Sequence, residues 1–213
     1  MKCDKDIMLL YAVTDRAWIG IRSLYEQVEC ALKGGVTCVQ LREKELYGDD
    51  FLKEAFEIKK LCRKYNVPFF INDNVEIAIA CKADGIHVGQ RDMQVQNVRQ
   101  LIGDNMILGV SAQTVEQALL AEKQGADYLG VGAVFTTKTK HDADYVPYDE
   151  LKKICNAVNI PVVAIGGIYK HNIMELSNSG VDGVALVSAI FAQEDIENAC
   201  KELSELSLAM VIK

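Results

Sequence analysis

The stretch Gln124-Gly125-Ala126-Asp127-Tyr128-Leu129-Gly130-Val131 carries the chain from the end of a helical pattern directly into a short apolar strand. Glycine just after a helix favours a left-handed C-cap, so we expect the helix to end there. The same join recurs along the chain, and strict alternation of strands with helices predicts a parallel sheet. Similar joins are Lys33-Gly34-Gly35-Val36, Lys82-Ala83-Asp84-Gly85 and Ser179-Gly180-Val181-Asp182.

Eight strand-like runs occur, each apolar enough to be buried on both faces. Between them, apolar residues at spacings of three and four predict helices. We expect strands at Met8–Val13, Cys38–Leu41, Pro68–Ile71, Gly85–Val88, Ile107–Val110, Tyr128–Val131, Pro161–Ile165 and Gly183–Val187. We expect helices at Ser23–Lys33, Asp50–Tyr65, Val75–Cys81, Val95–Ile102, Val115–Gln124, Tyr148–Ala157, Asn172–Ser179 and Asp195–Leu206.

Eight such units predict a single (β/α)8 barrel domain over residues 1–213, with its active site at the C-terminal ends of the strands. A doubly wound open sheet would more often have fewer strands and a Gly-rich turn, but no G-x-G-x-x-G follows the first strand. The longest irregular stretch, 136–147, is expected to be a mobile loop over the site.

The composition narrows the possible partners. A formal net charge of −7 argues against binding to nucleic acid or to an anionic membrane. Seven cysteines without a C-x-x-C pair predict reduced thiols, and no apolar run approaches the roughly 20 residues that span a bilayer. We therefore expect a cytoplasmic protein, and the sequence leaves a homo-oligomer open.

The second strand ends in an alternation of polar side chains. Gln40, Arg42 and Lys44 are expected to point to one side, where two cations and an amide would suit a phosphate or diphosphate. The alternative is a polar strand edge with salt bridges through Glu43 and Glu45.

Two carboxylates follow the third and fourth strands. Asp73 and Asp92 could share one Mg²⁺, which prefers oxygen ligands and is often shared with substrate phosphates. Each could instead cap the helix that follows it, near Val75 and Val95 respectively.

Hydroxyl groups, ammonium groups and glycines follow the sixth, seventh and eighth strands. The segment Thr136–Lys140 could order around an anion or be a solvated loop. Gly166-Gly167 and Val187-Ser188 stand where barrels often bind a phosphate through backbone N–H groups. The alternative there is a tight turn followed by a serine N-cap.

Two residues with ring side chains lie in or near predicted strands. His87 lies inside the fourth strand, so we expect a packed, hydrogen-bonded core histidine rather than a base. Tyr11, near the first strand, is expected either to pack or to stack against a planar ring.

The ordered motifs resemble those of the thiamine-phosphate synthase family, also called thiamine-phosphate pyrophosphorylase, over most of the chain. The chain departs from that pattern at Ala133 and Thr136, where proline is expected. The motifs are Gln40-Leu41-Arg42-Glu43-Lys44, Phe70-Ile71-Asn72-Asp73, the segment Ala83–Asp92, Gly109-Val110-Ser111, Thr137-x-Thr139-Lys140, Ile165-Gly166-Gly167-Ile168 and Val187-Ser188.

The resemblance implies an Mg²⁺-dependent transferase of thiamine biosynthesis that joins 4-amino-5-hydroxymethyl-2-methylpyrimidine diphosphate to 4-methyl-5-(2-hydroxyethyl)thiazole phosphate and releases diphosphate. Asp73 and Asp92 would bind the metal, while Arg42, Lys44 and Lys140 would neutralise the leaving diphosphate in a dissociative path. The implied pyrimidine diphosphate ligands are Gln40, Arg42, Lys44, Asn72, Ser111 and Lys140. The implied thiazole phosphate ligands are Thr137, Thr139, Gly167, Val187 and Ser188, and Leu41, Glu43 and Lys138 lie within the implied substrate-binding segments.

Three rival interpretations explain less of the sequence. The related thiazole tautomerase has no need for a diphosphate and metal set, and a phosphosugar isomerase or lyase barrel would need a general acid and base. A protein that only binds a phosphate ligand, without catalysis, would not need both carboxylates and cations beside one pocket.

Overall fold

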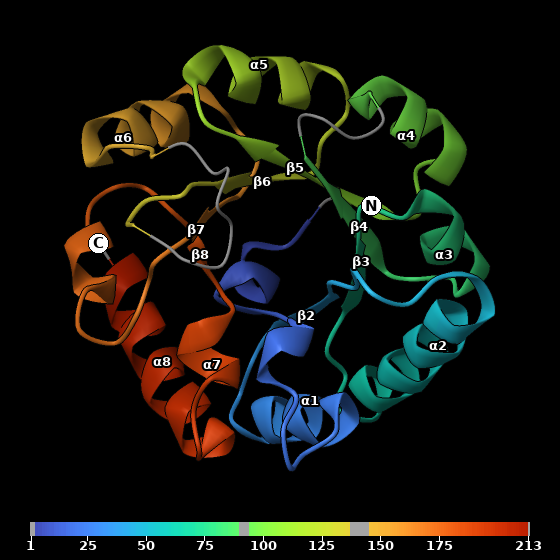
Figure 1. Ribbon diagram of the computed structural model, residues 1–213. Helices are drawn as coiled ribbons and strands as arrows, with labels where there is room; N and C mark the ends of the chain where they lie inside the picture. Colours follow the sequence, from blue (N-terminus) through green and yellow to red (C-terminus); the bar gives the residue numbers. More distant parts are fainter. Residues whose placement is uncertain (1–2, 90–93, 137–144, 213) are drawn as a thin grey trace.

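The computed structural model describes residues 3–89, 94–136 and 145–212. Its strands close into a barrel in the order β1 to β8, and every neighbouring pair is parallel, including β1 with β8. Figure 1 shows the helices arranged around this ring of strands. The predicted (β/α)8 barrel is therefore confirmed.

The strands agree closely with the sequence prediction, but one helix differs. At 172–179 the chain forms only a short 3-10 helix, η3 (Ile173–Leu176), and a short helix, α7, follows β8. The strands are β1 (Leu10–Val13), β2 (Cys38–Leu41), β3 (Phe69–Asn72), β4 (Gly85–Val88), β5 (Ile107–Ala112), β6 (Tyr128–Val131), β7 (Val162–Ile165) and β8 (Gly183–Leu186). The helices are η1 (Lys5–Met8), η2 (Arg16–Trp18), α1 (Leu24–Lys33), α2 (Gly48–Lys64), α3 (Val75–Ala80), α4 (Val95–Ile102), α5 (Val115–Lys123), α6 (Tyr148–Ala157), α7 (Ser188–Phe191) and α8 (Ile196–Val211).

The recurrent joins between a helix and the next strand end the helix and also bind the preceding strand. Gly35, Gly125 and Gly180 have positive φ angles of 92°, 97° and 95°, so the predicted left-handed helix ends are present. The next polar residue then accepts a hydrogen bond from the first or second N–H of the preceding strand. The bonds run from Leu10 N to Thr37 Oγ1, Phe69 N to Asp84 Oδ2, Leu108 N to Asp127 Oδ2 and Val162 N to Asp182 Oδ2.

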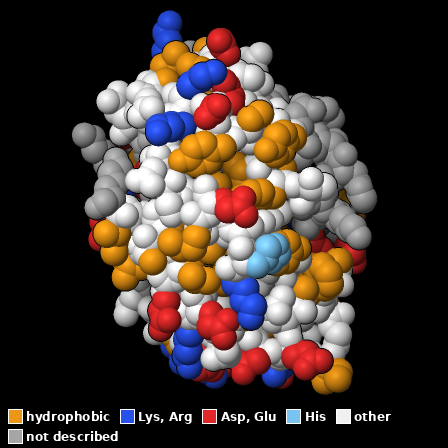
Figure 2. Space-filling view, turned by 90° about the vertical axis from the view of Figure 1, so that its left-hand side faces the viewer, with side chains coloured by type: hydrophobic (Ala, Val, Ile, Leu, Met, Phe, Trp, Pro, Cys, Tyr) orange, Lys and Arg blue, Asp and Glu red, His pale blue; other side chains and the backbone are white. Residues whose placement is uncertain are grey.

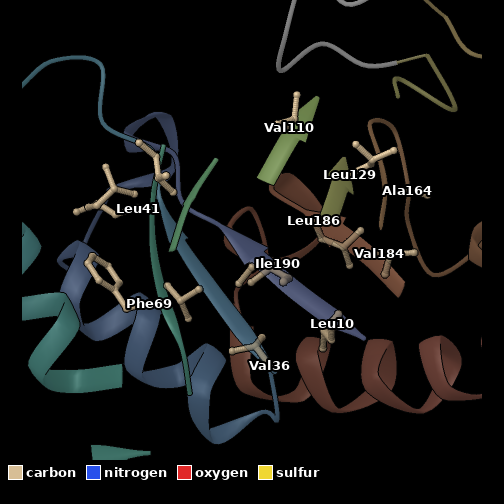
Figure 3. Close-up of a cluster of buried hydrophobic side chains, with 14 of the residues drawn as sticks. Leu10, Val36, Leu41, Phe69, Val110, Leu129, Ala164, Val184, Leu186 and Ile190 are labelled. Carbon is tan, nitrogen blue, oxygen red and sulfur yellow. The ribbon is translucent and has the colours of Figure 1, made fainter. Parts of the chain in front are cut away.

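Strand alternation creates two apolar cores. Residues such as Leu41 and Phe69 pack between the strands and the helices, in the larger cluster of buried side chains shown in Figure 3. Residues of opposite parity, such as Tyr11, Phe70 and Tyr128, fill the barrel interior. Toward the C-terminal ends of the strands the interior residues become polar, and the candidate site begins there.

Candidate active site

The end of β2 brings two cations to the rim of the barrel. Arg42 Nη1 lies 2.6 Å from Asp15 Oδ2, and Lys44 Nζ lies 2.6 Å from Asp73 Oδ2. Both cations are therefore paired with carboxylates that follow other strands. Of the salt bridges in the alternative, the one through Glu43 is present, with Arg16, and none through Glu45 is found among the described residues.

Leu41 and Glu43 have their side chains away from solvent. Leu41 is fully buried in the larger core. The Glu43 carboxylate accepts hydrogen bonds from Arg16 Nε at 2.5 Å and from the backbone N–H groups of Glu45 and Leu46. Burial opposes ionisation of Glu43, but these bonds hold its pKa below the ordinary value. The Glu43 side chain thus fixes the segment that carries Arg42, and its role as a substrate contact stays a prediction.

Beyond β3, the helix cap falls one residue later than the cap alternative placed it. Asn74 is the N-cap of α3, and its Oδ1 accepts from Ile77 N at 2.9 Å. The cap interpretation of Asp73 is therefore wrong. The Asp73 side chain is 28% exposed at the rim beside Lys44, and Asn72 is buried just before it.

Asp92 lies outside the described residues, so its pairing with Asp73 stays a prediction. The N-cap position of α4 is held by Gln94, whose side chain makes no capping hydrogen bond. The cap alternative for Asp92 also falls on a residue outside the described ranges. Across the part of the chain that the structure describes, no three His, Cys, Asp or Glu side chains converge in a way that could hold a metal ion.

Ser111 and His87 face each other inside the barrel. Ser111 Oγ lies 3.0 Å from His87 Nε2, and His87 Nδ1 lies 2.9 Å from Tyr128 Oη. The prediction of a hydrogen-bonded core histidine is confirmed. Gln40 is buried in the same interior, where its Nε2 donates to Tyr11 Oη at 2.7 Å.

The ends of β7 and β8 supply backbone donors. Gly166 and Gly167 have φ angles of 96° and 68°, and a Cβ on Gly167 would lie 2.5 Å from the Thr136 carbonyl oxygen. Val187 is at the N-cap position of α7, and Ser188 begins that helix with Oγ 2.7 Å from Tyr169 Oη. The serine N-cap alternative is therefore wrong. Within the described ranges, the N–H groups of Gly167 and Ser188 donate to no backbone carbonyl.

Two residues of the rim, Asp15 and Arg16, were not among the residues expected there from the sequence. Asp15 pairs with Arg42, and Arg16 bridges Glu43 and Glu54, at 2.5 and 2.6 Å. The signal was present, because both residues lie within three positions of the end of the first strand, as the other polar clusters follow theirs. The predicted ligands Thr137, Lys138, Thr139 and Lys140 lie outside the described residues.

A cavity of about 220 Å³ lies between α6, η3 and the segment that follows β6. Its lining includes Phe135, Tyr148 and Leu176. Figure 2, which views the side of the molecule that carries α6 and α8, shows hydrophobic side chains gathered among charged ones.

No helix within residues 3–89, 94–136 and 145–212 is long and apolar enough to span a membrane.

Known proteins resemble this chain in both sequence and fold. The model of a family described as thiamine monophosphate synthase matches residues 10–190. A thiamine-phosphate synthase of Clostridium tetani is 50% identical over 92% of this chain and 93% of its own length. One from Clostridioides difficile is 47% identical over 96% of each chain.

Among solved structures, a thiamine phosphate pyrophosphorylase from Pyrococcus furiosus superposes with a TM-score of 0.90 at 39% identity. The match covers 98% of this chain and 99% of that one. The ordered motifs, the closed barrel and the near-complete coverage of the chain by its relatives all point to one family. The chain therefore belongs to the thiamine monophosphate synthase family, a family of transferases.

Proposed function

We propose that this chain condenses 4-amino-5-hydroxymethyl-2-methylpyrimidine diphosphate with 4-methyl-5-(2-hydroxyethyl)thiazole phosphate to give thiamine phosphate and diphosphate. The observation that carries this proposal is the meeting of Arg42, Lys44 and Asp73 at one rim of a barrel of this family. Two cations and a carboxylate suit a diphosphate that is bound together with a divalent ion.

The diphosphate would lie against the end of β2 and the end of β3. Arg42 Nε is a buried donor for which no described residue supplies a partner, and it could donate to a phosphate oxygen. Lys44 is half exposed and supplies a second positive charge. The other proposed ligands of the pyrimidine diphosphate are Gln40, Asn72, Ser111 and Lys140.

Asp73 fits a magnesium ion in its chemistry, because it offers hard carboxylate oxygens at the rim beside the proposed diphosphate position. We propose Asp73 and Asp92 as its protein ligands. When bound, the ion would offset the charge that develops on the leaving diphosphate. Lys44 holds Asp73 at 2.6 Å, so its ammonium group lies beside the carboxylate that would hold the ion.

The bond changes need charge stabilisation rather than a protein nucleophile. The bond between the exocyclic CH₂ carbon and the diphosphate oxygen breaks, and its electron pair leaves with the diphosphate. Arg42, Lys44 and Lys140 offset the charge on that leaving group. The aminopyrimidine ring delocalises the positive charge on carbon until the lone pair of the thiazole nitrogen forms the new C–N bond.

The thiazole phosphate would bind at the ends of β7 and β8. Backbone N–H groups of Gly167 and Ser188 and the Ser188 hydroxyl are suitable donors there, and glycine lets a phosphate approach the backbone closely. Val187 lies between β8 and Ser188, and Thr137 and Thr139 are the further proposed contacts.

We place this reaction in one catalytic domain, residues 1–213, of a cytoplasmic protein whose partners are these two small molecules. The seven cysteines are all free, which is compatible with a reducing compartment. Nucleic acid and membranes are not among the proposed partners.

The test is to mix the purified protein with both substrates and either Mg²⁺ or EDTA, and to measure thiamine phosphate and diphosphate. Equal amounts of both products with Mg²⁺, and neither with EDTA, are expected. If neither product forms while the thiazole phosphate still binds, the proposal is wrong and a tautomerase or a binding protein becomes the better interpretation.

A further inference from the structure

The side chain of Asn172 is bound to the turn that follows β7, residues 166–169, which we call the β7 turn. Asn172 Nδ2 donates to the carbonyl oxygen of Gly167 at 2.9 Å, and Asn172 Oδ1 accepts from Tyr169 N at 2.7 Å. These two bonds fix the orientation of the amide, because turning it over would place oxygen against oxygen and N–H against N–H. Asn172 occupies the N-cap position of η3, yet its side chain makes no capping bond there. This buried amide is therefore used to hold the β7 turn rather than to start a helix.

The two central peptide groups of the β7 turn are both held by their carbonyl oxygens. Phe135 N donates to the Gly166 oxygen at 3.1 Å, and Asn172 Nδ2 donates to the Gly167 oxygen. Both peptide bonds are trans, so the N–H of each group points away from its carbonyl oxygen. The Gly167 N–H is thus directed away from Phe135, and the Ile168 N–H away from Asn172.

Neither of these two N–H groups has an acceptor within the described parts of the chain. The N–H of Tyr169, by contrast, is bonded to Asn172. Successive free N–H groups in a turn form a concave site that suits an anion. The β7 turn therefore offers two neighbouring donors, from Gly167 and Ile168, at the proposed position of the thiazole phosphate.

The glycines explain why the β7 turn needs to be held from outside. Gly166 and Gly167 have positive φ angles of 96° and 68°, and a Cβ on Gly167 would lie 2.5 Å from the Thr136 oxygen. Glycine is therefore required where the turn packs on the segment after β6. Glycine also has the largest backbone freedom of any residue, so its peptide groups rotate easily unless another group restrains them. Phe135 and Asn172 supply that restraint, one for each peptide group.

The β7 turn is also connected to the end of β8. Tyr169 Oη lies 2.7 Å from Ser188 Oγ, and Ser188 is a proposed ligand of the same phosphate. The two strand ends that would share the thiazole phosphate are thus in direct contact through side chains.

We propose that Asn172 is a positioning residue for the thiazole phosphate. It acts through the β7 turn, by holding the N–H groups of Gly167 and Ile168 in the orientation in which they donate to the phosphate oxygens. Without Asn172 the peptide group between Gly167 and Ile168 would be free to rotate, and ordering it again on binding would cost free energy. This inference rests on the proposed function and deepens its account of how the thiazole phosphate is bound.

The first experiment measures steady-state turnover of the wild-type protein and of Asn172→Ala. The KM for the thiazole phosphate should rise about tenfold, because two hydrogen bonds to a charged group lose their ordered donors. The kcat and the KM for the pyrimidine diphosphate should stay within about twofold of the wild-type values, because Arg42, Lys44 and Asp73 are unchanged.

The second experiment follows the amide resonances of Gly167 and Ile168 by NMR. In the wild-type protein both amides should be rigid before and after thiazole phosphate is added, and both proton resonances should move downfield on binding. In Asn172→Ala the heteronuclear NOE of Ile168 should be low in the free protein and should rise when the ligand binds. A general loss of stability would not produce this local change.

Thr37→Val is the matched control. Thr37 Oγ1 also holds two backbone groups, since it accepts from Leu10 N at 2.9 Å and donates to the Ile7 oxygen at 3.0 Å. These groups lie at the opposite end of the barrel, so both KM values should remain at the wild-type level. If Asn172→Ala does not fold, Asn172→Asp takes its place, because it keeps an acceptor for Tyr169 N and loses the donor to Gly167.

An equal rise of both KM values in the Asn172 variant would overturn the inference, and so would wild-type amide resonances of Gly167 and Ile168 that do not move on binding. An unchanged KM for the thiazole phosphate, with normal turnover, would reject only the positioning role. If the wild-type protein neither forms thiamine phosphate nor binds the thiazole phosphate, the positioning role and the proposed function are rejected together.

Discussion

Asp73 is the residue whose neighbours most directly test the metal proposal. Its carboxylate is bound by Lys44, while Asp15 holds Arg42 in a similar ion pair, also at 2.6 Å, on the same rim. We expect Asp73→Asn to raise the Mg²⁺ concentration needed for half-maximal turnover at least about tenfold, because it removes a carboxylate ligand.

The matched control is Asp15→Asn. It should weaken the pyrimidine diphosphate interaction through Arg42 without changing the Mg²⁺ dependence. Identical Mg²⁺ titrations for Asp73→Asn and the wild-type protein would remove Asp73 from the metal site.

Cys38, Cys62 and Cys200 are fully buried, and their thiols should be inert in the folded protein. Burial raises the pKa of Cys62 and of Cys200 to about 12 and that of Cys38 well above its usual value. A raised pKa keeps the thiol protonated, so only about one Cys62 in ten thousand would be a reactive thiolate at pH 8.

Alkylation at pH 8, followed by peptide mass spectrometry, should modify these three cysteines in denaturant and leave them unmodified in the native state. Native labelling of Cys62 at the rate seen in denaturant would contradict the buried placement.

On the scale of the strand, the packing of β5 inside the barrel requires glycine at position 109, Gly109. A Cβ at Gly109 would lie 2.1 Å from Tyr128 Cζ, inside the barrel where neighbouring strands cannot separate. Gly109→Ala should therefore lower the free energy of unfolding by at least about 1–3 kcal/mol, the usual cost of overpacking. Gly20→Ala is the control, because nothing lies within 4 Å of its added Cβ. Equal urea midpoints for the two variants would refute this account of β5.

The elements that the sequence predicted well have strong local signals. The joins before β6 and β8 combine a glycine that must adopt positive φ with an aspartate that binds the preceding strand, and both strands were predicted at their observed starts. The segment 172–179 has helical spacing, but its backbone leaves the helical conformation at Ser177, with ψ 141°, and at Asn178, with φ 63°, so only the 3-10 helix Ile173–Leu176 forms.

The positions of site residues at the ends of strands, and the side to which each residue faces, were predictable from the sequence. Strand parity explains why Gln40 faces inward and Leu41 outward. The ion-pair partners of these side chains were not predictable. Arg42 pairs with Asp15 and Lys44 with Asp73, although Glu43 is nearer in the sequence. The two aspartates come to lie beside these cations only when the barrel closes.

On the scale of the whole molecule, the barrel brings two proposed anion sites to one rim from distant parts of the chain. The diphosphate site uses residues near β2 and β3, and the monophosphate site uses the ends of β7 and β8. Because closure pairs β1 with β8, both sites stabilise the same cooperative unit. Ligands that bind only the folded state therefore raise the melting temperature of the entire barrel.

Thermal unfolding should reveal the two sites as separate contributions. At about 100 times its dissociation constant a ligand adds about 2.7 kcal/mol, which corresponds to about 5–10 °C in a chain of this size. Inorganic diphosphate should raise the Tm only when Mg²⁺ is present, and thiazole phosphate should raise it with Mg²⁺ or with EDTA. Ser188→Ala should reduce only the thiazole phosphate shift, and Asp73→Asn only the shift from Mg²⁺ and diphosphate. An equal diphosphate shift in EDTA would show that the cations hold the diphosphate without a metal ion.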